Sequence, residues 1–401
     1  MDLSLFTSFT ASLTAQEAQI AQLQQQISSG VAVQTPDQNP AAYETGVLGN
    51  DQISQLNGDN TTQAAVQVQL GNVSDAYSSM STLFDNVQTI VEQALNGTTS
   101  AANMNALAQQ VKSASQQLRG IGNKTAPNGT YLFGGSRGSL APFQANANGD
   151  IVYFGDGGGS RASIAPGQTA STLANGDVLV SSLAGDGISN VTANSANTGS
   201  GQILQQGVVN ASAANAFQQG SAAITVTFGG GNTYTATQNG SAIASGTLST
   251  SSSGTTLQLA GVDYQITGSP ANGDRFTIAP ARPQSAFTLL QNIYNALAST
   301  SGTPAQVAQT NQALNQSLAG LAQYQQAVLT AQAQNGVTLQ AITTAAASNT
   351  GQATKTQINV DNATAVNMPA AISSLTQTMT ALQAAMKTFG TVQSLSLFKY
   401  L

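Results

Sequence analysis

In this sequence, the segment that most resembles a reactive site is Gly155-Asp156-Gly157-Gly158-Gly159-Ser160, which looks superficially like a phosphate-binding loop. A glycine-rich loop cradles phosphate when Gly-Lys-Ser/Thr follows and opens a helix, because the backbone N–H groups and the lysine then face the phosphate together. No lysine follows here, so we expect a β-turn. Four aspartates of the same region are candidate calcium ligands: Asp150, Asp156, Asp177 and Asp186. Their spacing fits no EF-hand loop, so we expect ordinary turn residues there too.

The sequence contains no His and no Cys. This removes the commonest general base and metal ligand, and also thiolate nucleophiles, disulfides and zinc–sulfur sites. A hydrolase that used Asp263 or Asp274 is the enzymatic alternative, but no nucleophile constellation accompanies either residue. We therefore expect no enzyme activity, no cofactor and no metal.

Only 6% of the residues are charged, against roughly 25% in a typical soluble domain. Such a low proportion of charged residues is typical of a protein whose surface is buried in an assembly, or of a protein that lies outside the cell. Nine acidic residues precede the first basic one, Lys112, and no basic patch exists to neutralise phosphates, so we expect no nucleic-acid partner. The segment Met1–Phe6 lacks the basic start of a secretion signal, and no apolar run is long enough for membrane insertion.

The elements that would position any site are long helices at both ends of the chain. Their apolar residues step alternately by three and four positions, as in a coiled coil, and such a stripe needs a partner. The simplest partner of the first stripe is the last one. A lone pair of helices has too little core, so we expect neighbouring copies to complete both stripes. The predicted assembly interface comprises Phe6, Phe9, Leu13, Ile20, Leu23, Ile27, Ile372, Leu375, Met379, Leu382, Met386, Phe389, Leu397, Phe398, Tyr400 and Leu401.

The middle of the chain encloses a different pattern. A heptad rhythm from Val66 to Ala94 resumes from Leu107 to Ile121 and indicates the core of a helical bundle. Helical rhythm returns at Phe287 and weakens at Asn349-Thr350-Gly351. Short strands separated by turn signals are predicted at 151–154, 177–180, 224–228, 257–259 and 275–278, with a loose loop or insertion at 186–222.

We therefore predict an α+β multidomain fold in which coiled-coil-like helices from both chain ends form a nested stalk that carries an inserted β-rich outer domain. The predicted division is a terminal helical assembly domain (1–40 and 355–401), a helical rod domain (41–135 and 285–354) and the β-rich domain (136–284).

Several segments resemble the flagellin family. Ile27-Ser28-Ser29-Gly30, followed by the Pro-Asp-rich connector at 35–40, is similar to its N-terminal signature. Asn128–Gly135, Gly273–Ile278 and the ending Ser396–Leu401 resemble the hook-associated members of the family. The resemblance covers roughly residues 1–155 and 270–401.

This resemblance implies a structural component of the bacterial flagellum that self-assembles into a junction ring between hook and filament. It implies export through the flagellar type III channel without a cleaved signal peptide, and an extracellular location at the hook–filament junction. The implied partners are other copies of the chain, a hook-side junction protein, flagellin and an export chaperone. The alternatives are a filament flagellin of the same family and a secreted adhesin-like binding protein.

Overall fold

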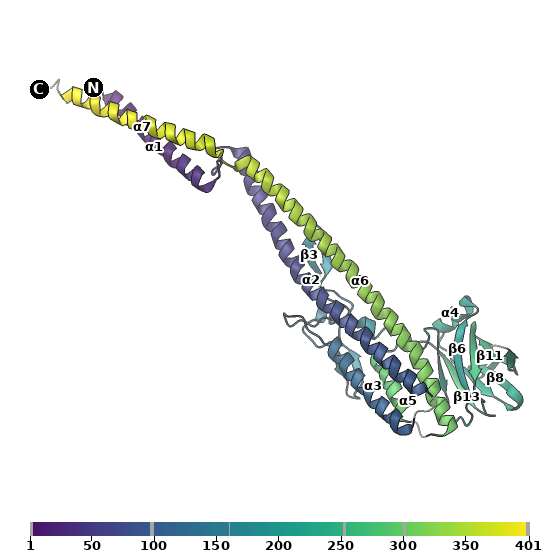
Figure 1. Cartoon of the computed structure of the whole chain (residues 1–401). Coiled ribbons are helices and arrows are strands. Elements are labelled where there is room, and N and C mark those ends of the chain that lie inside the picture. Colours follow the sequence, from purple (N-terminus) through teal and green to yellow (C-terminus); the bar gives the residue numbers. More distant parts are fainter. Residues whose placement is uncertain (1–2, 97–99, 160, 252–253, 300–301, 398–401) are drawn as a thin grey trace. The chain divides into compact units, whose positions relative to one another are not determined.

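The computed structural model describes residues 3–96, 100–159, 161–251, 254–299 and 302–397. The helices are α1 (Leu3–Ser29), α2 (Pro40–Leu95), α3 (Ala101–Gly122), α4 (Ala211–Gln219), α5 (Ala286–Ala298), α6 (Pro304–Thr364) and α7 (Met368–Leu397). The strands are β1 (Phe143–Ala145), β2 (Ile151–Tyr153), β3 (Arg161–Ala165), β4 (Gln168–Ser171), β5 (Ser189–Ala193), β6 (Gln202–Val208), β7 (Ile224–Phe228), β8 (Thr233–Gln238), β9 (Ser241–Thr247), β10 (Ser249–Ser251), β11 (Gly254–Leu259), β12 (Val262–Thr267) and β13 (Arg275–Pro280). Figure 1 shows these elements along the chain.

The three longest helices begin at residues that are suited to a helix start. Asn39 precedes Pro40, and its side chain accepts a hydrogen bond from the Ala42 N–H at 3.2 Å. Thr303 precedes Pro304 and accepts from the Gln306 N–H at 3.3 Å. Asn367 caps α7 in the same way. A capping side chain satisfies an N–H that lacks a helical partner, and proline at the next position has no N–H to satisfy.

The chain divides into two compact units, which are described separately. The first comprises Met1–Gln63, Ile164–Gln168 and Thr343–Leu401. Here α1 and α7 lie side by side, with the first turns of α1 beside the last turns of α7 (Figure 1). The connectors between helices are also paired, because the Ala32 N–H donates to the Thr364 carbonyl at 2.7 Å and the Val366 N–H donates to the Gly30 carbonyl at 2.9 Å.

Close helix packing in the first unit depends on glycine. A Cβ at Gly49 of α2 would overlap the Cγ2 of Val360 on α6, whereas a Cβ at Gly58 would meet nothing within 4 Å. Asn349 lies in the C-terminal half of α6, and its side chain donates to the Ile164 carbonyl at 3.3 Å. The predicted weakening of the helix at 349–351 is therefore wrong, because this buried bond gives the Asn349 amide a partner and the helix continues to Thr364.

The second unit comprises Ala64–Ser163 and Thr169–Ile342, and its helical core follows the predicted heptads. Every apolar residue of the stripe from Val66 to Ala94 is buried, and so are Leu107, Val111, Ala114 and Leu118 of α3. From Val73 onward, these residues pack with residues of α5 and α6 in one cluster that also contains Phe133 and Phe143. The prediction that the 66–94 stripe is an intramolecular core is confirmed.

The β-rich part of this unit has its own core between a five-stranded sheet, ordered β5-β13-β7-β8-β9, and a four-stranded sheet, ordered β10-β11-β12-β6. All neighbouring strands in these two sheets are antiparallel. The pairs β1–β2 and β3–β4 form separate two-stranded sheets.

The strand predictions at 151–154, 224–228, 257–259 and 275–278 are confirmed by β2, β7, β11 and β13. Two other predictions are wrong. Residues 176–179 form a short 3₁₀ helix instead of a strand, because the Asn175 side chain caps the Asp177 N–H and tightens the chain into a turn. The segment 186–222 is not a loose loop, because it contains β5, β6 and α4.

Candidate assembly interface

The glycine-rich loop is a turn that is fastened by its aspartate. The Asp156 carboxylate accepts from the backbone N–H groups of Ser136 at 2.7 Å and of Gly158 at 3.1 Å, and it lies 3.7 Å from the Arg137 guanidinium. The bonds from the Ser136 hydroxyl and N–H lower the pKa of Asp156 below its usual value. The next element is the strand Arg161–Ala165, so the helix that a phosphate loop requires does not follow.

Of the two carboxylates considered for a hydrolase, Asp274 holds the chain in place. The buried Asp274 accepts from the N–H groups of Thr198 at 2.8 Å, Gly199 at 3.1 Å and Ala271 at 2.8 Å. Asp263 lies on β12 opposite Gln258. Within the described residues, no group of three or more His, Cys, Asp or Glu side chains is placed to hold a metal ion. In the same part of the chain, no helix is both long enough and apolar enough to cross a membrane.

The terminal helices bring the two predicted apolar stripes together. The rings of Phe9 and Phe389 stack with centroids 4.7 Å apart and planes inclined by 7°. Along α1, the side chains of Leu13, Ile20, Leu23 and Ile27 are all half-buried. The first stripe therefore has the last one as its partner within the same chain.

The apolar residues of α7 divide between two faces. Leu375, Leu382 and Phe389 are half-buried. In contrast, Ile372, Met379 and Met386 are 50%, 42% and 50% exposed, and Met368 is 40% exposed. Each of the three half-buried residues follows a residue of the exposed set by three positions. A step of three residues turns about 60° short of a full helical turn, so the two sets lie on adjacent faces of α7. We call the set Met368, Ile372, Met379 and Met386 the exposed stripe.

The sequence prediction did not separate these two faces of α7, because the face that packs against α1 also carries small residues. The half-buried or buried row on α7 is completed by Ala371, Thr378 and Ala385, which are small residues between the larger apolar ones. Apolar periodicity alone does not give weight to alanine and threonine. A pattern of small residues at the a-to-d spacing of a close helix pair was the signal available in the sequence.

Five residues of the predicted interface cannot be placed by their side chains. Phe6 and Leu397 lie near the outer ends of α1 and α7. Phe398, Tyr400 and Leu401 lie outside the described residues, and the prediction for them stays a prediction.

Comparison with known proteins shows what the chain resembles. Residues 4–137 match the family model of the bacterial flagellin N-terminal helical region. Two relatives described as flagellar hook-associated protein 3 also match. The one from Salmonella typhimurium is 27% identical over 141 residues, 34% of this chain and 43% of the relative. The one from Escherichia coli is 29% identical over 137 residues, 33% of this chain and 41% of the relative. The matched part is less than half the length of either relative.

Solved structures extend the likeness beyond the N-terminal region. FlgL from Xanthomonas campestris is 26% identical, and the match covers 72% of this chain and 93% of that chain with a TM-score of 0.64. Flagellar hook-associated protein-3 from Legionella pneumophila shares the fold at 22% identity, with 79% and 98% covered and a TM-score of 0.73. Residues 4–137 are therefore similar to the flagellin N-terminal region, and the fold, long helices with a β-rich part, is that of the hook-associated structure. The chain is similar to flagellar hook-associated protein 3, as its signature segments predicted.

Proposed function

We propose that this protein is a non-enzymatic, structural component of the junction between flagellar hook and filament. The observation that carries this proposal is the exposed stripe on α7, a helix whose other apolar face is already covered by α1. Apolar residues in a regular row on a helix that is already paired are suited to packing against further helices. The relatives described above are named as hook-associated proteins or FlgL, and for this reason we place the packing in the flagellum.

In this proposal, α1 and α7 of one subunit pack against those of its neighbours in a homo-oligomeric ring. The interface consists of the predicted residues of both helices, with Ile372, Met379 and Met386 facing the neighbour. The ring contacts a hook-side junction protein on one side and flagellin on the other. Before assembly, an export chaperone covers the same apolar side chains, and the chain reaches the cell exterior by the flagellar export route.

The three-part organisation predicted from the sequence belongs to this proposal as well. The terminal helices (1–40 and 355–401) make the ring, the long helices (41–135 and 285–354) form the rod, and the β-rich part (136–284) faces outward. A filament flagellin is the second candidate, because the family model that matches is shared with flagellin.

A deletion strain tests the junction function. Without the protein, cells should assemble hooks but should release flagellin into the medium instead of building filaments, and the wild-type gene should restore filaments. Filaments of normal length on the deletion strain would contradict the proposal. If the deletion strain instead made no flagellin at all and its intact hooks carried no filament protein, the flagellin alternative would be favoured.

A further inference from the structure

In the helical core of the second unit, acidic and basic side chains lie on different helices. There α2, α3, α5 and α6 pack around one apolar cluster. All acidic residues of these helices within the unit belong to α2, all basic ones belong to α3, and α5 and α6 contribute none. The five charged residues are Asp75, Asp85, Glu92, Lys112 and Arg119, and all are exposed. Among the described residues, none of the five forms an ion pair.

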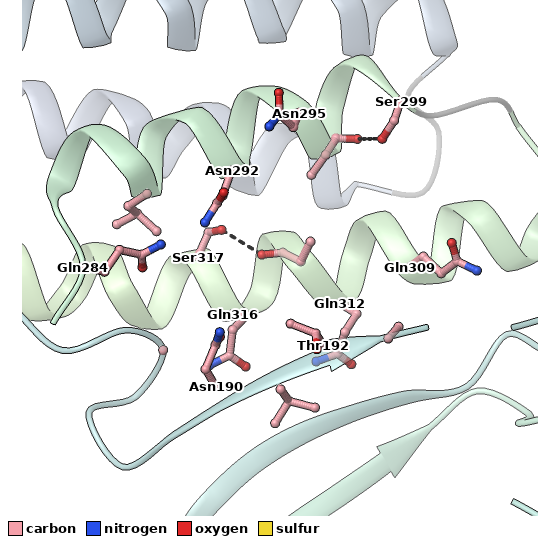
Figure 2. A pocket seen from close by; sticks show the side chains of 16 residues that line it. Asn190, Thr192, Gln284, Asn292, Asn295, Ser299, Gln309, Gln312, Gln316 and Ser317 are labelled. Atoms are coloured by element: carbon pink, nitrogen blue, oxygen red, sulfur yellow. Dashed lines mark hydrogen bonds between the residues drawn. The ribbon is translucent and has the colours of Figure 1, made fainter. Parts of the chain in front are cut away.

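The order of these helices around the core defines four sides. Helix α2 adjoins α6, where the rings of Phe84 and Tyr324 stack at 5.8 Å, and it adjoins α3 along a groove. Helix α3 also packs along α5. Figure 2 shows the side between α5 and α6, where Gln312 and Gln316 lie beside the strand β5, so the β-rich part occupies this side. The α2–α6 side and the α3–α5 side are therefore opposite each other, and each borders the side that carries the β-rich part.

The side between α2 and α6 is acidic. The Asp85 carboxylate accepts from the Gln325 side chain of α6 at 2.6 Å, which places Asp85 on the α6 side of α2. Glu92 follows Asp85 by seven residues, about 20° short of two full turns, so it faces nearly the same way. Leu329 lies one turn after Gln325 and is 50% exposed, which adds apolar surface to this side. We call Asp85, Glu92 and Leu329 the acidic face.

The side between α3 and α5 is basic. On α3, the groove toward α2 is lined by Gln117, Gly120 and Ile121. Lys112 lies five residues before Gln117 and Arg119 lies two after it, so they are about 140° and 160° away from that groove around the helix. Both therefore lie on the side of α3 that adjoins its other neighbour, α5. We call Lys112 and Arg119 the basic face.

We infer that the acidic face of one copy packs against the basic face of the next. The inference rests on the proposed assembly of neighbouring copies, and it adds a contact between their helical cores. The two charged residues of each face are seven positions, or about 10 Å, apart along their helix. Helices α2 and α3 run in opposite directions (Figure 1). When two copies lie parallel and side by side, Asp85 is therefore opposite Arg119, and Glu92 is opposite Lys112.

The sign of the charges decides which faces meet. Two acidic faces repel each other, as do two basic ones, so the contact is head-to-tail. Repeated head-to-tail contacts generate closed rings or helical arrays. One molecule carries both faces at matching spacing, so the partner that fits is another copy of the chain. Exposed ion pairs add little affinity, so the terminal helices supply most of the association and the charges fix the neighbour and its register.

Cross-linking on assembled flagella tests the contact directly. The sequence contains no Cys, so each introduced thiol is unique. A strain that lacks the wild-type gene expresses the full chain with Glu92→Cys and Lys112→Cys, and intact cells are treated with a short bismaleimide. We expect a ladder of dimers, trimers and larger products, because each copy then offers one thiol to each of two neighbours. Coexpressed single-thiol chains should give dimers and nothing larger, and either single-thiol chain alone should give at least tenfold less dimer.

Charge reversal gives an independent test in the same strain. Lys112→Glu with Arg119→Glu should lower the amount of protein retained on flagella at least fivefold. Adding Asp85→Lys and Glu92→Lys to that chain should restore at least half of the loss, because every contact is again between opposite charges. The matched control is Asp75→Lys, an equal change of charge on α2 but one turn before Ser79 of the α2–α3 groove. It should leave retention unchanged.

The outcomes separate this contact from the junction function. Absence of the ladder, equal dimer from a single-thiol chain alone, or no rescue by the four-residue reversal would overturn the inference. Retention of the double-thiol chain at the boundary of hook and filament would then show that the junction function stands without it. A ladder together with label along the whole filament would support this contact and overturn the junction function.

Discussion

The exposed stripe on α7 makes a quantitative prediction about assembly. Complete burial of an Ile or Met side chain contributes about 1.5–3 kcal/mol. Ile372, Met379 and Met386 are already about half buried within the chain, so burial of the remainder against a neighbour contributes about 1 kcal/mol each, or about 3 kcal/mol together. The triple variant Ile372→Gln, Met379→Gln and Met386→Gln should therefore weaken subunit association about 100-fold.

The assay compares retention of the protein on flagella with its release into the medium, in a strain that lacks the wild-type gene. The triple variant should be exported but found mainly in the medium, and the cells should lose motility. A matched control, Ser373→Gln, Thr380→Gln and Thr388→Gln, changes exposed polar positions of the same helix and should retain motility. Both purified proteins should show similar helical content and melting temperature. Normal incorporation of the triple variant, with the control behaving identically, would refute the role of the exposed stripe.

Three further predictions concern stability. Gly49→Ala should lower the free energy of unfolding by about 1–3 kcal/mol in a thermal melt, because the new Cβ overlaps Val360, while Gly58→Ala, with open space around it, should raise it by up to about 1 kcal/mol. Gln312→Leu should lower the free energy of unfolding by about 1–3 kcal/mol and should accelerate amide hydrogen exchange in β6, because the Ile203 N–H and carbonyl lose their partner. Unchanged hydrogen exchange in β6 would contradict this. Burial raises the pKa of Tyr77 from 10.0 to about 12, so its stabilising contribution is full below pH 10 and falls by about 1.4 kcal/mol per pH unit as the pH rises from about 10 to 12. Tyr77→Phe should make denaturant unfolding less sensitive to pH in that window, and an identical pH dependence in the variant would argue against the shift.

The helical core was predictable because its signal is local and redundant. The stripe from Val66 to Ala94 repeats over many turns, and every apolar position in it is buried. The strand prediction at 177–180 failed because a short apolar run does not distinguish a strand from a buried turn. Leu179 is fully buried, but the cap from Asn175 sets the local backbone. The segment 186–222 was underestimated because its polar composition resembles that of a loop, whereas partners distant in sequence, such as Gln312, hold its strands.

The pairing of the two terminal helices was predictable, but its geometry was not, and the assembly residues on them stay a prediction. The heptad period places Ile372 and Leu375 in one stripe, yet the structure leaves the first exposed and turns the second toward α1. The face of α7 that is buried in the pair also carries the small residues Ala371, Thr378 and Ala385. Apolar periodicity gives no information on which face is buried, so the exposed stripe emerges only from the folded pair.

Immunogold labelling of intact, flagellated cells with an antibody against the β-rich part most directly tests the structural role at the junction of hook and filament. We expect a single band of label on each flagellum, at the boundary between hook and filament. Label distributed along the whole filament would contradict it and would identify the protein as a filament subunit.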